Sequence, residues 1–139
     1  MNNSKLVAST MTFRTFTLEK ALEKLAEAGF DKVELCTVGD WVPHFDIANA
    51  TDKSITDCAG IFKRTGMKAV SINISGDFTV NQLENGYALA KELGAAVVTY
   101  CCGNPKPEIG RSEQLKERAE FNSKLADLGD KYGLICSIE

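Results

Sequence analysis

The side chains that could do chemistry interrupt apolar, strand-like runs. Glu34 stands between Val33 and Leu35, Asn73 lies within "AVSINIS", and Glu139 is the last residue, after "LICSI". Carboxylates can act as general acids and bases, and a pair of them can serve the two sides of one substrate. Glu34, Asn73 and Glu139 are therefore the first candidates for a polar site.

Each candidate also has an ordinary structural explanation. Glu34 could face solvent on an edge strand, Asn73 could be a turn residue, and Glu139 could be a frayed, solvated chain end. His44, the only histidine, lies in the loop "GDWVPHFDIANATD" with Trp41. A lone histidine in a loop is usually solvated, and Trp41 could simply fold the loop onto the protein. Residue type alone does not decide between these alternatives.

A strand followed by an amphipathic helix recurs along the chain and would position these residues. The pattern predicts strands over residues 5–10, 32–38, 68–75, 95–101 and 134–139, and helices over residues 17–28, 54–64, 80–93 and 112–131. Each helix is followed by a glycine and then by a new β-rich run. This order is typical of βα units wound right-handedly onto one parallel sheet. The predicted fold class is α/β.

Composition limits the range of functions. A chain of 139 residues is expected to form a single domain, residues 1–139, with a substantial core. The net charge of −3 argues against nucleic acid as a partner. We find no secretory signal and no run of about 20 apolar residues for a membrane span, so we expect a cytoplasmic protein. The five cysteines form no CxxC pair and are expected to be reduced thiols that mostly pack as small buried hydrophobes.

Two architectures use five parallel strands of this kind. A flavodoxin-like sheet, with strand order 2-1-3-4-5, would be a complete binding module at this length. A (β/α)8 barrel would be represented only in part. The third strand favours the barrel, because its alternation places Ala69, Ser71, Asn73 and Ser75 on one small, polar face. We therefore predict strand order 1-2-3-4-5 and keep the flavodoxin-like module as an alternative.

Four segments together carry a family resemblance: "LEKALEKLAEAGFDKVELC", "PHFDIANATD", "GMKAVSINIS" and "AKELGAAVVTYCCG". The chain resembles the sugar phosphate isomerase/epimerase family, which has the xylose-isomerase-like TIM barrel. The resemblance implies a partial TIM (β/α)8 barrel, its N-terminal half, with about four βα units plus a fifth parallel strand. It also implies that Glu139 is both a metal ligand and a catalytic residue for proton transfer, with further ligands on later strands.

The implied function is metal-dependent isomerisation or epimerisation of a sugar or sugar phosphate, in which a proton moves next to a carbonyl. The cofactor would be Mn²⁺, Mg²⁺, Co²⁺ or Zn²⁺. We expect Glu34, Trp41, His44 and Asn73 to bind substrate. The 139-residue chain alone is expected to lack the rest of the site, to be inactive, and to self-associate through unpaired strand edges.

An endonuclease-IV-like hydrolase of the same superfamily is an alternative. The loop "PHFDIAN" is similar to the first histidine-bearing loop of those enzymes, which hold zinc ions with several histidines. The end of the fourth strand reads "TYCCGN", without the histidine found there in those enzymes. A single histidine and an acidic balance make this alternative the weaker of the two.

Overall fold

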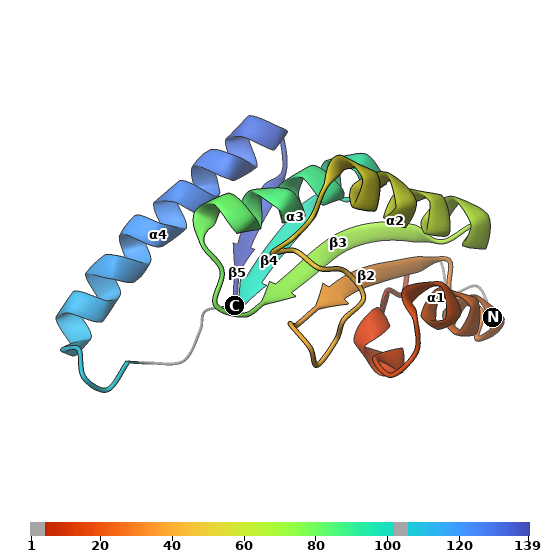
Figure 1. Ribbon diagram of the computed structural model, residues 1–139, viewed down its shortest axis with the longest axis horizontal. Coiled ribbons are helices and arrows are strands. Elements are labelled where there is room, and N and C mark those ends of the chain that lie inside the picture. The colour runs from red at the N-terminus through yellow and green to blue at the C-terminus, as the bar shows by residue number, and fades with distance from the viewer. Residues whose placement is uncertain (1–4, 102–105) are drawn as a thin grey trace.

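The computed structural model describes residues 5–101 and 106–139, in which five parallel strands alternate with four α-helices (Figure 1). The elements, in chain order, are β1 (Ala8–Ser9), the 3-10 helix η1 (Thr10–Phe13), α1 (Leu18–Glu27), β2 (Lys32–Thr37), α2 (Asp52–Thr65), β3 (Lys68–Ser75), α3 (Val80–Leu93), β4 (Val97–Cys101), α4 (Arg111–Tyr132) and β5 (Ile135–Ile138). The α/β class predicted from the sequence is confirmed. Cys102, one of the cysteines expected to be reduced, lies outside the described residues.

The strands form one sheet in the order β1-β2-β3-β4-β5, and every neighbouring pair is parallel. Each βα unit therefore adds its strand beside the preceding one, as in the wall of a barrel. The predicted order is confirmed. The flavodoxin-like alternative is wrong, because it needs the second strand outside the first.

Local signals explain the helix boundaries. Thr17 and Thr79 cap the first turns of α1 and α3, accepting hydrogen bonds from the backbone N–H groups of Lys20 and Gln82. α3 ends at Gly94, whose φ of 69° lies in the left-handed region that favours glycine. Such caps fix the points at which the chain leaves each helix for the next strand.

The beginning of the chain departs from the predicted strand over residues 5–10. Only Ala8 and Ser9 pair with β2, and the chain turns into a 3-10 helix at Thr10. The side chain of Ser9 accepts a hydrogen bond from the backbone N–H of Met11, which stabilises this turn. The first strand is therefore much shorter than its apolar run indicates.

The core lies between the four helices and one face of the sheet. Buried side chains from every helix form one cluster with alternate residues of β2, β3 and β4, including Leu35, Ile72 and Val98. The other strand residues, such as Ser71 and Asn73, point to the opposite face, which we call the inner face. Ser71 and Asn73 are only half-buried. The curved sheet with its helices on the outside is visible in Figure 1.

One residue of the predicted polar face belongs to the core instead. Ala69 is 5% exposed and packs in the core cluster. The pairing register shifts between Val33 and Glu34, so that Val33 pairs with Ala69 but Glu34 pairs with Ser71. Val70 is therefore an extra residue, and a bulge of this kind breaks the strict alternation on which the prediction depended.

Within the described residues, no helix is long and apolar enough to span a membrane.

Candidate functional site

A polar cluster lies on the inner face near the carboxyl ends of β3, β4 and β5. The side chain of Asn73 donates a hydrogen bond to Oε2 of Glu139 over 3.4 Å. The thiol of Cys101 lies 3.4 Å from the same oxygen and 3.5 Å from Oδ1 of Asn73. We call Asn73, Cys101 and Glu139 the strand-end cluster.

The sheet itself positions this cluster. Asn73 pairs with Thr99 in β4, and the backbone N–H of Glu139 donates to the carbonyl of Tyr100 over 3.1 Å, which continues the β4–β5 ladder. Because the strands are parallel, their carboxyl ends meet at one edge. Glu139 is exposed, so its carboxylate is accessible to a small molecule at this edge.

Cys101 is a member of the cluster that sequence reasoning missed, since it was expected to pack as a small hydrophobe. Its burial, and next its hydrogen bond to Glu139, raise the pKa of the thiol above its ordinary value. The neutral thiol can therefore donate to the carboxylate. The signal was present in the strand alternation, because Thr99 and Cys101 share one face of β4 and Tyr100 lies on the other.

Glu34 lies farther along the inner face, on β2. Its carboxylate accepts a hydrogen bond of 3.1 Å from the hydroxyl of Ser71, so this mid-strand charge has a polar partner. Beside it, Cys36 is fully buried, and its burial followed by the charge of Glu34 raises the pKa of the Cys36 thiol to about 11. The inner face therefore carries neutral thiols next to carboxylates.

His44 and Trp41 are not linked to the strand-end cluster by any contact within the described residues. His44 is 7% exposed, and its Nδ1 lies 3.0 Å from Oγ1 of Thr10, which also accepts the backbone N–H of Cys36. Trp41 is 51% exposed, and the guanidinium of Arg14 lies 4.9 Å from the centre of its ring. His44 thus connects the loop after β2 to Thr10, the first residue of the 3-10 helix η1.

The burial of His44 predicts a pH-dependent stability. Burial lowers the pKa of His44, and the backbone carbonyls of Phe16 and Phe13 oppose this shift to a smaller extent. Unfolding restores the ordinary pKa, so the unfolded chain binds more protons. We expect the contribution of neutral His44 to the free energy of unfolding to be complete above pH 6.5. The free energy should fall as the pH is lowered toward 5.

Urea unfolding at a series of pH values measures this slope. His44 is the only histidine, so the variant His44→Gln should lose the slope between pH 7 and pH 5 while remaining folded at pH 7. An unchanged slope in this variant would contradict the assignment to His44.

Comparison with known proteins adds to this geometry. No protein-family model and no curated protein matches the chain. Among solved structures, an L-ribulose 3-epimerase is similar with a TM-score of 0.69 and 19% identity, over 96% of this chain and 48% of that one. The IolI protein with a bound zinc atom gives 0.68 and 18%, over 95% and 50%. A xylose isomerase-like TIM barrel protein from Mycobacterium smegmatis, in complex with magnesium, gives 0.64 and 18%, over 96% and 54%.

The chain therefore has the fold of part of a TIM barrel. More particularly, it has the fold of the xylose isomerase-like barrels, as the sequence resemblance implied, and it spans about half the length of these structural neighbours. At such low identities the likeness concerns the fold. The activity has to be argued from the residues of this chain.

The strand-end cluster does not by itself fit a divalent metal. A metal ion of this kind needs several ligands in a fixed geometry. Among residues 5–101 and 106–139, no group of three or more histidine, cysteine, aspartate or glutamate side chains could hold one. Glu139 and Cys101 supply two such groups, and the Cys101 thiol is protonated in this arrangement.

Proposed function

We propose that this chain supplies one half of the active site of a sugar isomerase or epimerase. The observation that carries the proposal is the exposed carboxylate of Glu139 at the carboxyl end of β5, held by Asn73 and Cys101. Active sites of TIM-barrel enzymes lie at this end of the strands. The L-ribulose 3-epimerase with the same fold supports a ketose as the substrate.

Glu139 acts as the general base in this proposal. Its carboxylate removes the proton from the carbon next to the substrate carbonyl, which leaves an enediolate and a protonated Glu139. Asn73 holds the carboxylate in position through its amide and can also bind a substrate hydroxyl. Return of a proton to the other face of the enediolate completes an epimerisation. That second step needs an acid from outside the described residues.

The structure suits three residues that were expected to bind substrate to different roles: Glu34, Trp41 and His44. Glu34 shares the inner face with Asn73, so it is suited to bind a hydroxyl of a longer sugar. Trp41 is exposed and can cover a substrate at the mouth of the barrel, whereas His44 is buried and acts by fixing the same loop. A divalent cation beside Glu139 would need ligands from outside the described residues.

The test is exchange of the C3 proton of L-ribulose into D2O, followed by NMR. A full-barrel form of the protein should catalyse the exchange in a way that depends on Glu139. The 139-residue chain should not convert L-ribulose to its C3 epimer, because the strand-end cluster supplies a single carboxylate. Turnover by the 139-residue chain alone would contradict the proposed division of the site.

We also propose that the 139-residue chain self-associates. In the described structure β1 pairs only with β2 and β5 only with β4, so each has one unpaired edge. Ile135 on β5 is 63% exposed, and an exposed apolar edge recruits further strands. We expect light scattering to give a mass above that of one chain.

Two substitutions distinguish association through the β5 edge from non-specific association through exposed apolar residues. Ile135→Lys should shift the chain toward the monomer. Leu115→Lys, at a residue 62% exposed on α4, should leave the mass unchanged. A monomeric wild-type chain at high concentration would contradict the proposal.

A further inference from the structure

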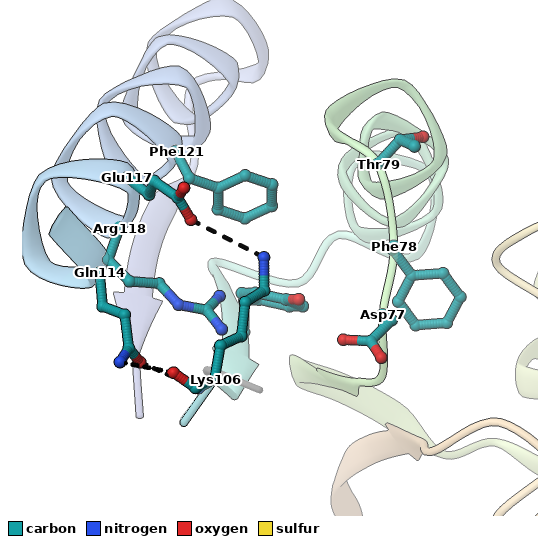
Figure 2. A pocket seen from close by; sticks show the side chains of 9 residues that line it. Asp77, Phe78, Thr79, Lys106, Gln114, Glu117, Arg118 and Phe121 are labelled. Carbon is teal, nitrogen blue, oxygen red and sulfur yellow. Dashed lines mark hydrogen bonds and ion pairs between the residues drawn. The ribbon is translucent and has the colours of Figure 1, made fainter. Parts of the chain in front are cut away.

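A cavity lies on the helix side of the strand ends, away from the strand-end cluster. It has a volume of about 350 Å³ and is bounded by the loop between β3 and α3, by β4, and by the first half of α4. The residues that line it are Asp77, Phe78, Thr79, Tyr100, Lys106, Gln114, Glu117, Arg118 and Phe121. Figure 2 shows their side chains around the space between α4 and the loop that carries Asp77.

One wall of the cavity is held in place by a side chain of α4. Gln114 accepts the backbone N–H of Lys106 over 2.9 Å and donates to the carbonyls of Lys106 and Ile109 over 2.8 and 2.7 Å. The segment that precedes α4 is thereby fixed against the first turns of that helix. These hydrogen bonds fix the backbone of Lys106, whose side chain lines the cavity.

Two cations and two carboxylates line the cavity, and among the described residues only Lys106 and Glu117 form an ion pair. The ammonium of Lys106 lies 3.7 Å from the carboxylate of Glu117. Arg118 is half-buried, and its guanidinium is directed into the cavity in Figure 2. Among the described residues it has no ion-pair partner. A guanidinium that has lost part of its hydration gains most from a planar or tetrahedral oxyanion.

Aromatic rings and a helix terminus complete the site. Tyr100 and Phe121 pack with their ring centres 5.6 Å apart, whereas the ring of Phe78 points away from α4 in Figure 2. Thr79 caps α3, whose first turn carries no acidic residue, so the positive end of the helix dipole meets the cavity without a carboxylate in that turn. Asp77 is exposed at the rim, where its carboxylate can accept hydrogen bonds from hydroxyl groups.

We propose that this cavity binds a small polyhydroxylated molecule that carries a phosphate or a carboxylate. Arg118, assisted by Lys106, binds the oxyanion. Phe121 packs against the carbon skeleton, and Asp77 accepts hydrogen bonds from its hydroxyl groups. The volume lies within the range of small-molecule pockets.

This site is separate from the strand-end cluster. Tyr100 faces α4, whereas the next residue, Cys101, faces Glu139 on the inner side of the sheet. Binding in the cavity can therefore be measured without turnover, and its loss would leave the role proposed for Glu139 unaffected.

Calorimetric titration of the 139-residue chain tests the proposal with ribose 5-phosphate, gluconate, inorganic phosphate and neutral ribose. We expect saturable binding of at least one of the two anionic sugars, and weaker binding of ribose. Arg118→Gln should raise the Kd of the anionic sugar about tenfold, because one charge-assisted contact is lost. Arg111→Gln removes the same charge from an exposed position of α4 that does not line the cavity, and should change the Kd less than about twofold.

Two further variants keep the test decisive. Arg118→Lys retains the charge and the aliphatic stem and should give an intermediate Kd, which covers the case that Arg118→Gln does not fold. Asp77→Asn should strengthen binding of inorganic phosphate by removing the negative charge at the rim. The proposal is overturned by equal losses in the Arg118 and Arg111 variants, by equal affinity for ribose and its phosphate, or by no binding up to about 10 mM.

Discussion

Replacing Glu139 by glutamine is expected to slow C3 proton exchange of L-ribulose by about three orders of magnitude in a full-barrel form of this protein. Glutamine keeps the length and shape of the side chain, so its amide oxygen can still accept the hydrogen bond from Asn73. It cannot take up a proton at neutral pH. The loss should therefore appear in kcat, with little change in KM.

Two controls interpret that result. Glu113→Gln removes a carboxylate from the exposed first turn of α4 and should leave the exchange rate unchanged. Asn73→Ala leaves the carboxylate in place but removes one of its hydrogen bonds, so we expect a smaller loss, about tenfold. If Glu139→Gln retained the full rate, Glu139 would not be the base.

The candidate site could be predicted from the sequence where strands supply it. Alternation within β3 placed Asn73 on a polar face, and the family resemblance implied a role for Glu139 at the end of β5. The structure joins the two side chains by a hydrogen bond. Cys101 could not be singled out, because a free cysteine in a strand usually packs as a small hydrophobe. Trp41 and His44 lie in a loop, where no periodicity reports whether a side chain is exposed or buried.

The same distinction applies to the fold. The boundaries of β3 and α3 agree with their predicted ranges, because a capping threonine and a terminal glycine delimit the helix. The short β1 and the core position of Ala69 could not be predicted. The first depends on the Ser9 turn, and the second depends on a bulge defined by pairing with β2. The Ser9 turn is a local side chain–backbone hydrogen bond inside an apolar run, whereas the bulge is a consequence of pairing between two strands.

The second large effect concerns stability and the contact between α3 and β3. Gly86 lies on the buried face of α3, and a Cβ atom there would collide with Cδ1 of Ile74. It would also lie 3.6 Å from Cδ1 of Ile47, which closes the space on that side. Ile74 is fully buried and Ile47 is 1% exposed, so neither side chain can move into solvent. The helix itself would have to shift away from the sheet.

We therefore expect Gly86→Ala to lower the free energy of unfolding by about 2 kcal/mol, even though alanine has the better helix propensity. Gly60→Ala is the matched control in α2, because the added Cβ would meet only Nη1 of the flexible Arg64 side chain, at 3.3 Å. That variant should be stabilised by roughly 0.5–1 kcal/mol. Urea unfolding monitored by circular dichroism measures both. Opposite signs for the two variants would show that close approach of α3 to β3, and not loss of glycine itself, sets the cost; equal stabilisation would contradict the packing described here.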